Sequence, residues 1–176
     1  MLTISQVNSE AEIVAVQELM LEYATWAFTL VPGSNKAPAW EGFDEELATL
    51  PGVYAPPEGR LLLAMQDGQP AGCVCLKGHD ATTSELKRLY VRPTFRGQNI
   101  GQQLVKMLIE EARQSRYQRI VLDSHISMKK AHAIYQEVGF RLASAPDDFP
   151  ENLKPIVVFM ECDVCTQRLS EKVSLE

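Results

Sequence analysis

The sequence lacks both a long apolar run and a basic leader. Nowhere do about 18 apolar residues follow one another without interruption, which is the minimum length of a membrane-spanning helix. The first ten residues, MLTISQVNSE, contain neither a basic segment nor an apolar one and so do not resemble a secretory leader. These absences argue against a membrane protein and predict a cytoplasmic one.

Cysteine and histidine are scarce, with four cysteines and three histidines in 176 residues. Cys73-x-Cys75 and Cys162-x-x-Cys165 could in principle supply the thiolates of a tetrahedral zinc site. However, Cys73 and Cys75 repeat on one face of an apolar run, and free cysteine is among the most frequently buried residue types. We interpret the cysteines as core residues and predict no metal site, with a zinc-bearing interaction module as the weakest alternative.

Positive charge is also in short supply. The 17 lysines and arginines are outnumbered by 23 aspartates and glutamates, and the isoelectric point is near 5.2. Nucleic acid and membrane surfaces are therefore not expected partners, whereas a cationic small molecule or a basic protein tail is. A chain of this length can bury about 70% of its unfolded surface in one core. We expect one domain over residues 1–163 and a polar tail at 164–176.

The pattern of apolar residues predicts an α/β (α+β) fold. Ser9 and Glu12 form a capping box that predicts the start of a helix, and Asp67-Gly68 predicts a hairpin turn. The predicted strands are 3–7, 60–66, 71–77, 85–91, 119–123, 141–143 and 156–163, and the predicted helices are 9–30, 43–50, 99–114 and 128–138. Strand, helix and strand between 85 and 123 predict a parallel central pair. The sheet is therefore mixed and mostly antiparallel, with about seven strands and about four flanking helices.

The stretch Ser84–Ala112 carries the strongest functional signal. It reads as a strand, a proline break, a short polar loop and a helix, so unpaired N–H groups and the positive end of the helix dipole point to one place. Four cations lie within ten residues there: Lys87, Arg88, Arg92 and Arg96. A solvated charged face is the alternative. We favour an anion site, for which phosphate is the usual ligand.

Two common phosphate motifs do not fit this stretch. A Walker A loop requires G-x-x-x-x-G-K-S/T, but Gly101 comes one residue early and is followed by two glutamines. A dinucleotide loop requires G-x-G-x-x-G, which is absent. Gly97 is expected to adopt a positive φ, and Gly101, lacking Cβ, to allow close approach of a ligand or a strand.

The same stretch resembles the acyl-coenzyme A loop of the GNAT superfamily of N-acetyltransferases. That loop reads Gln/Arg-x-x-Gly-x-Gly/Ala after a strand ending in Val-x-Pro. Arg96 occupies the first place and Gly101 the last, whereas Asn99 stands where the family usually has glycine. Asparagine tolerates a left-handed backbone better than most residues, so this departure is mild.

A second stretch, AHAIYQEVGF from Ala131 to Phe140, resembles the helix that flanks the thioester in that family. The two motifs together extend the resemblance over most of 60–163. Seven residues before Tyr135 the family often has an asparagine that contacts the coenzyme, but here the residue is Met128, so that contact is not carried over. Met128 and Asn99 keep open the alternative of a non-catalytic acyl-CoA sensor.

The resemblance implies an acyltransferase that moves an acetyl group from acetyl-CoA, its co-substrate, directly to a primary amine of a small molecule or peptide. The main chain of Leu89, Tyr90 and Val91 would hold the pantetheine arm and supply the oxyanion donor, and Ala131 would leave room for the arm. The pyrophosphate would lie on Arg96, Gly97, Gln98, Asn99, Ile100 and Gly101. A homodimer is compatible with this reading.

Two side chains are the predicted catalysts. Tyr135 is the predicted general acid, because a phenol with an ordinary pKa near 10 holds its proton at neutral pH and can donate it to the departing thiolate. Its alternative is a core aromatic. Glu85 is the predicted base, at a position where some family members carry a catalytic glutamate. An ion pair with Lys87 is the alternative role, and His125 is the second candidate for the base. His79 and His132 are expected in a loop and on a helix surface.

The segment Val31–Glu58 is irregular and rich in proline. Trp40, Phe43 and Tyr54 within it fit either an acceptor-binding lid or plugs of the core, and the sequence favours neither. A candidate acceptor wall comprises Trp26, Phe28, Trp40, Phe43, Tyr54 and Phe149, with Glu41, Asp44, Asp147 and Asp148 as candidate charges.

Overall fold

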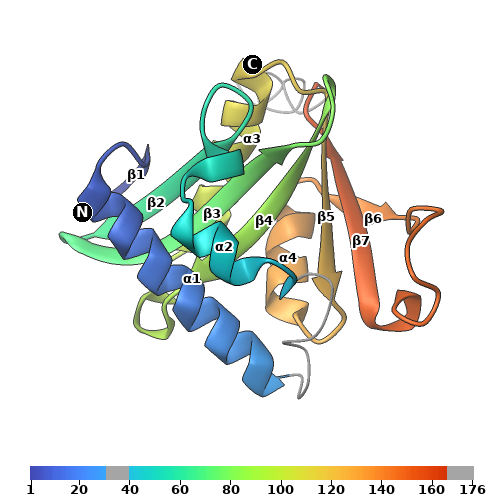
Figure 1. Cartoon of the computed structure of the whole chain (residues 1–176), viewed down its shortest axis with the longest axis horizontal. Helices are drawn as coiled ribbons and strands as arrows, with labels where there is room; N and C mark the ends of the chain where they lie inside the picture. The colour runs from blue at the N-terminus through green and yellow to red at the C-terminus, as the bar shows by residue number, and fades with distance from the viewer. Residues whose placement is uncertain (31–39, 166–176) are drawn as a thin grey trace, which may run out of the picture.

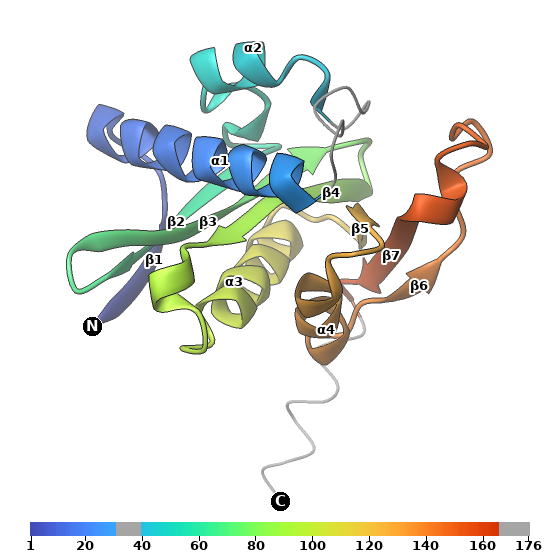
Figure 2. The same cartoon turned by 90° about the horizontal axis from the view of Figure 1, so that it is seen from below.

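The computed structural model describes residues 1–30 and 40–165. Within them a seven-stranded sheet, in the order β1-β2-β3-β4-β5-β7-β6, is covered by α1 and α2 on one face and by α3 and α4 on the other (Figure 1 and Figure 2). The strands are β1 Leu2–Gln6, β2 Arg60–Gln66, β3 Gln69–Gly78, β4 Thr83–Val91, β5 Arg119–His125, β6 Arg141–Ala143 and β7 Val157–Asp163. The helices are α1 Glu10–Leu30, α2 Phe43–Ala48, α3 Ile100–Gln114 and α4 Lys129–Glu137, with short 3-10 turns η3 Gly52–Tyr54, η4 Pro93–Phe95 and η5 Lys154–Ile156. The mixed sheet and its parallel pair, β4 and β5, confirm the predicted fold class.

Two local signals act as predicted. Before α1, Ser9 Oγ accepts a bond from the Glu12 N–H at 3.3 Å, and Glu12 Oε2 accepts one from the Ser9 N–H at 3.1 Å, which is a capping box. Between β2 and β3, Asp67 and Gly68 have φ of 52° and 78°. Two successive positive φ values are typical of the type I′ hairpin turn, whose twist matches that of the strands.

Each face of the sheet packs its own hydrophobic core, because side chains alternate along every strand. Leu62 packs toward α3, whereas its neighbours Leu61 and Leu63 pack toward α1. The predicted stripe on α3 is buried along its whole length, at Ile100, Leu104, Leu108 and Ala112. Each fully buried leucine or isoleucine contributes about 1.5–3 kcal/mol, so these two cores hold the helices to the sheet.

The cysteines divide between these cores. Cys73 and Cys75 lie in the core under α1, and Cys162 lies in the core under α3. Burial raises the pKa of the Cys73 thiol to about 12 and that of Cys162 to about 11. Cys73 and Cys75 therefore lie on the opposite face of the sheet from Cys162, and Cys165 is exposed, so the four thiols do not converge on one ion as the zinc-module alternative requires.

The parallel pair opens toward the end of β4. Its register joins Thr83 to Arg119 and ends with Glu85 opposite Val121. Beyond that point β4 contains a bulge, because Cys75 pairs with Lys87 but Cys73 pairs with Tyr90, which leaves Arg88 and Leu89 opposite one residue of β3. Bulges bend a strand and leave a main-chain group unpaired. The second half of β4 thus runs beside β5 without continuing the ladder.

The ends of the elements differ slightly from the predictions. β4 begins at Thr83 and β5 continues to His125, so both are longer than predicted. Val164, which we assigned to the tail, is fully buried, and its N–H donates to Gln118 O at 2.8 Å. In the parts of the chain described here, every helix is too short or too polar to cross a membrane.

Candidate active site

The loop after β4 presents main-chain donors at the start of α3. Gly97 has φ of 82° and Asn99 has φ of 59°, so Asn99 adopts the left-handed backbone that was predicted for it. The first intrahelical bond runs from the Gln103 N–H to Asn99 O at 3.0 Å, and the Asn99 side chain does not cap the helix. The N–H groups of the first turn, beginning at Ile100, therefore point toward solvent with the positive end of the helix dipole. This arrangement suits an anion.

Gly101 joins the loop to the rest of the site. A Cβ added there would lie 3.1 Å from Ile134 Cδ1 and 3.6 Å from Val91 Cγ2. The group that approaches Gly101 closely is thus a side chain of α4, together with the end of β4. The absence of a side chain at 101 lets α3, α4 and β4 meet behind the loop.

The four cations around the loop have different partners, and Lys87 Nζ lies 3.4 Å from Glu85 Oε1. Arg92 Nη2 lies 2.7 Å from Glu22 of α1, and Arg88 Nη2 lies 2.7 Å from Glu46 of α2. Arg96 Nε donates to Val91 O at 3.0 Å, and its guanidinium lies 5.3 Å from the Trp26 ring centre. Within the described residues no carboxylate pairs with Arg96, so its charge is the one at the loop that is still available to an anion. The sequence could not separate these roles.

Tyr135 lies on α4, where it is 5% exposed and its ring centre is 5.6 Å from that of Phe140. Its hydroxyl forms no hydrogen bond with any residue the structure describes. Burial raises the pKa of the phenol far above its ordinary value, and the nearby Tyr23 and Asp123 add to this effect. The phenol therefore holds its proton at neutral pH. An unpaired buried hydroxyl requires an explanation, and a catalytic role is one.

Glu85 and Asp123 bring two carboxylates to the face of the sheet that α1 and α2 cover. Glu85 lies 3.4 Å from Lys87 Nζ and 3.6 Å from His79 Nε2. The predicted alternative for Glu85, an ion pair with Lys87, is thus present in the structure. Asp123 is an exposed residue at the end of β5, and the charges of Glu85, Lys87 and Arg88 of β4 act on its carboxylate.

Asp123 is a functional candidate that the sequence analysis missed. Desolvation by the surrounding protein raises its pKa, the negative charge of Glu85 raises it further, and Lys87 and Arg88 oppose the change. A carboxylate with a raised pKa is a better proton acceptor than an ordinary one. The signal available in the sequence was a single acidic residue closing the apolar run RIVLD.

The histidines are engaged in local contacts. His125 Nδ1 lies 2.8 Å from Ser127 Oγ, and His132 Nε2 lies 3.1 Å from Ser124 Oγ. The prediction of a surface position for His132 is wrong: the residue is buried, and burial lowers its pKa. It packs the start of α4 against the end of β5. His125 as a base stays a prediction.

The aromatic residues of the predicted acceptor wall divide between buried core positions and half-buried positions. Phe43 and Tyr54 are buried, so they are core residues. Trp40 is half-buried, and its ring centre lies 5.4 Å from that of Tyr23 and 5.0 Å from that of Phe28. The ring centres of Phe149 and Phe159 of β7 lie 4.8 Å apart.

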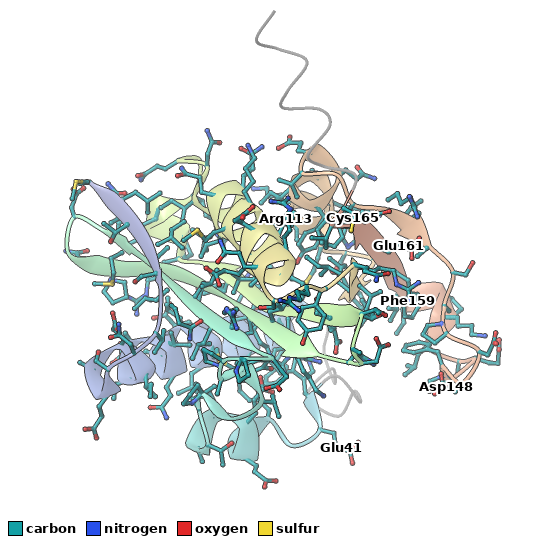
Figure 3. All side chains as sticks on the ribbon, turned by 90° about the horizontal axis from the view of Figure 1, so that it is seen from above. Glu41, Arg113, Asp148, Phe159, Glu161 and Cys165 are labelled. Carbon is teal, nitrogen blue, oxygen red and sulfur yellow. The ribbon has the colours of Figure 1, made fainter. Side chains whose placement is uncertain are left out.

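Figure 3 shows Asp148 in the loop before β7 and Glu41 beside α2, so these charges lie on separate elements. Residues 31–39 of the predicted lid lie outside the described residues.

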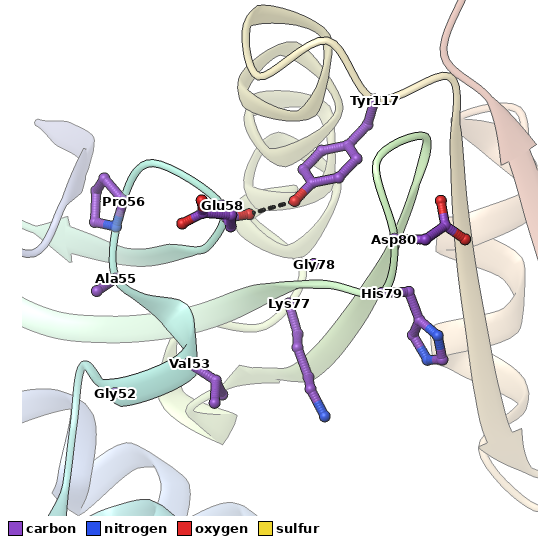
Figure 4. A pocket seen from close by; sticks show the side chains of 10 residues that line it. All are labelled: Gly52, Val53, Ala55, Pro56, Glu58, Lys77, Gly78, His79, Asp80 and Tyr117. Carbon is purple, nitrogen blue, oxygen red and sulfur yellow. Dashed lines mark hydrogen bonds between the residues drawn. The ribbon is translucent and has the colours of Figure 1, made fainter.

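A hollow of about 460 Å³ lies at the opposite end of β4 from the loop at 96–101. The β3–β4 turn and the segment before β2 enclose it (Figure 4). Its lining includes Val53, Glu58, Lys77, His79 and Tyr117. Tyr117 donates to Glu58 O at 2.8 Å, and His79 also contacts Glu85. The hollow therefore borders the acidic part of the site but not the anion loop.

Comparison with known proteins supplies the family. The model of the acetyltransferase (GNAT) family matches residues 16–140. An uncharacterized N-acetyltransferase of Schizosaccharomyces pombe is 33% identical over 127 residues, which cover 71% of this chain and 76% of that protein. An IAA acetyltransferase of Azospirillum brasilense is 31% identical over 110 residues, covering 62% and 71%. The PaiA N-acetyltransferase of Thermoplasma acidophilum, solved with coenzyme A, has a TM-score of 0.73 at 18% identity over 93% of this chain and 99% of that one. This chain belongs to the GNAT family of acetyltransferases, as the two sequence motifs predicted.

Proposed function

We propose that this chain is an N-acetyltransferase in which an amine attacks the thioester of acetyl-CoA directly and no acyl-enzyme forms. The observation that carries the proposal is the Tyr135 phenol, which is buried, holds its proton at neutral pH and has no hydrogen-bond partner among the residues that the structure describes. A proton donor of this kind is needed where a thiolate leaves.

The loop at 96–101 is the proposed pyrophosphate site. Main-chain donors from Gly97 to Gly101 and the charge of Arg96 would hold the two phosphates. The main chain of Leu89–Val91 would hold the pantetheine arm, with Ala131 beside it on α4. The end of the parallel ladder at Glu85 and Val121 supports this assignment, because β4 beyond that point no longer pairs with β5.

The proposed reaction moves two protons and one acyl group. A base takes a proton from the acceptor ammonium, and the free amine attacks the carbonyl carbon. Main-chain N–H groups at Leu89–Val91 would stabilise the oxyanion. When the carbon–sulfur bond breaks, the Tyr135 hydroxyl gives its proton to sulfur. The second proton lost by the amine nitrogen restores the phenol, so the products are an amide, coenzyme A and one released proton.

Glu85 and Asp123 are the two carboxylate candidates for the base. Glu85 is the residue predicted from the family resemblance, but His79 and Lys87 already contact it. Asp123 has the raised pKa, and its charge acts on Tyr135. We therefore propose Asp123 as the proton acceptor, with Glu85 setting its pKa and attracting the acceptor ammonium.

An amine screen tests this function. Purified protein is incubated with acetyl-CoA and a library of small amines and short peptides, and thiol release and the acetylated product are measured together. Transfer to a set of amines is the expected result. Tight binding of acetyl-CoA without transfer to any amine would favour the sensor alternative instead.

A further inference from the structure

Arg88 holds an unusual backbone conformation at the centre of the sheet. It is a buried residue of β4 with φ of 57°, in the left-handed region that residues other than glycine rarely adopt. It lies in the bulge, where the register passes from Lys87 to Tyr90. A strained conformation of this kind persists when the surrounding contacts determine it.

Those contacts come from α2 and its flanks, which lie over this face of the sheet (Figure 2). Arg88 Nε lies 3.0 Å from Glu46 Oε1, and Arg88 Nη2 lies 2.7 Å from Glu46 Oε2, so the ion pair is bidentate. The guanidinium also lies 4.6 Å from the centre of the Trp40 ring and 5.1 Å from that of Phe43. Bidentate geometry and ring contacts fix the orientation of the guanidinium, not merely its charge.

Glu46 is held from a second side. Tyr54 donates its hydroxyl to Glu46 Oε1 at 2.6 Å. Burial would raise the pKa of Glu46, but the hydrogen bonds and charge of Arg88 outweigh burial and lower it. The carboxylate is therefore ionised at neutral pH and locked between Arg88 and Tyr54.

We propose that Arg88 is a positioning residue for acyl transfer, and that its bond to Glu46 sets the direction of the main chain at Leu89–Val91. The inference rests on the proposed function, because that main chain is the proposed site of the pantetheine arm and the oxyanion. In this proposal the side chain acts on the reaction through the main chain of β4 and not by contact with the reacting atoms, and Glu46, Trp40 and Phe43 hold its guanidinium.

The Arg88–Glu46 ion pair, which we call the clamp, links two parts of the site. α2 and Trp40 lie on the proposed acceptor side, and the bulge lies on the thioester side. A shift of α2 on acceptor binding would therefore reach the oxyanion donor through one ion pair. Misplacement of catalytic groups by about 1 Å can cost roughly 100-fold in rate, so a residue in this position affects kcat without contacting substrate.

The pair Arg88→Ala and Arg88→Gly separates backbone from side chain. Both variants lose the clamp, but glycine adopts positive φ freely, whereas alanine resists it. We expect kcat to fall by roughly 100-fold in Arg88→Ala and by roughly 10-fold in Arg88→Gly, with a smaller change in acetyl-CoA affinity. A role in stability alone predicts equal, near wild-type kcat for the folded fraction of both. Near wild-type kcat in the folded fraction of both variants would overturn the proposal.

Glu46→Gln tests the other half of the clamp and serves if the Arg88 variants do not fold. Glutamine keeps the shape and can still accept from Tyr54, but it lacks the charge that holds Arg88. We expect a fall in kcat of roughly tenfold. Glu45→Gln, on the exposed neighbouring residue of α2, is the matched control and should retain wild-type kcat. Wild-type kcat in Glu46→Gln would remove the clamp from the mechanism.

Amide hydrogen exchange distinguishes a failure of this inference from a failure of the proposed function. Faster exchange at Leu89–Val91 in Arg88→Ala and Glu46→Gln than in wild type is the expected result, and this readout requires no turnover. If the wild-type protein acetylates no amine while the exchange result holds, the proposed function fails, and what stands is the ordering of the main chain at Leu89–Val91 by Arg88 and Glu46. Unchanged exchange in both variants would refute the positioning role, whatever the activity.

Discussion

Tyr135→Phe removes one hydroxyl group and should separate catalysis from stability. General acid catalysis contributes about 100- to 10,000-fold in rate, which is about 3–5 kcal/mol of transition-state stabilisation. We expect kcat to fall by that factor, while the affinity for acetyl-CoA stays within about twofold because the anion loop is unchanged. The hydroxyl makes no hydrogen bond in the described protein, and an unsatisfied buried hydroxyl costs about 1–3 kcal/mol. The free energy of unfolding of Tyr135→Phe should therefore equal or exceed that of wild type.

The assay follows thiol release at saturating acceptor, with acetyl-CoA affinity from calorimetry and unfolding from denaturant titration. The stabilities of the two proteins can be compared near pH 7. Folding raises the pKa of Tyr135, so ionisation of this phenol lowers the free energy of unfolding only above its ordinary pKa near 10. Tyr117→Phe is the matched control. It loses a bond to Glu58 O, so it should lose about 1 kcal/mol of stability and keep its kcat. A Tyr135→Phe protein with wild-type kcat would refute the assignment of the acid.

Three further changes test the base and the anion loop. Asp123→Asn should lower kcat roughly 100-fold and remove the acid limb of the pH profile; since Glu85 raises the pKa of Asp123, Glu85→Gln should instead move that limb to lower pH. An unmoved limb in both variants would exclude Asp123. Arg96→Ala should weaken acetyl-CoA binding roughly tenfold and reduce its salt dependence, as calorimetry at two ionic strengths would show; equal affinity would count against the loop assignment. Asn99 has φ of 59°, so Asn99→Gly should retain acetyl-CoA affinity and Asn99→Val should lower it, and equal affinities would mean that this conformation is not required.

The fold was predictable because its signals are local. The capping box at Ser9 and the Asp67-Gly68 turn depend on residues that are close in sequence, and both form as predicted. The parallel pair followed from the order of elements, since a crossover helix requires it. The bulge at Arg88 has no comparable signal, because arginine favours neither bulges nor positive φ.

A motif yields a candidate site where it places groups on one short segment. The loop at 96–101 and Tyr135 are candidates of this kind, and their roles stay predictions. Arg88 and Arg96 look alike in sequence, yet the partner of Arg88 is Glu46, 42 residues away, and this long-range pair removes Arg88 from the anion site. Asp123 was missed for the same reason: the groups that change its pKa, Glu85 and Lys87, come from another strand.

The two departures from the family pattern do not favour a sensor. Asn99 has φ of 59° and ψ of 13°, so the loop obtains from asparagine the left-handed turn for which the family uses glycine. Met128 Sδ lies 3.9 Å from the Tyr23 hydroxyl, so this residue contacts α1. A sensor needs affinity alone, and a buried unpaired phenol and a carboxylate with a raised pKa both reduce stability without adding affinity. Tyr135 and Asp123 carry these two costs and lie close enough to interact electrostatically, which is what the proposed proton transfer would require and a sensor would not.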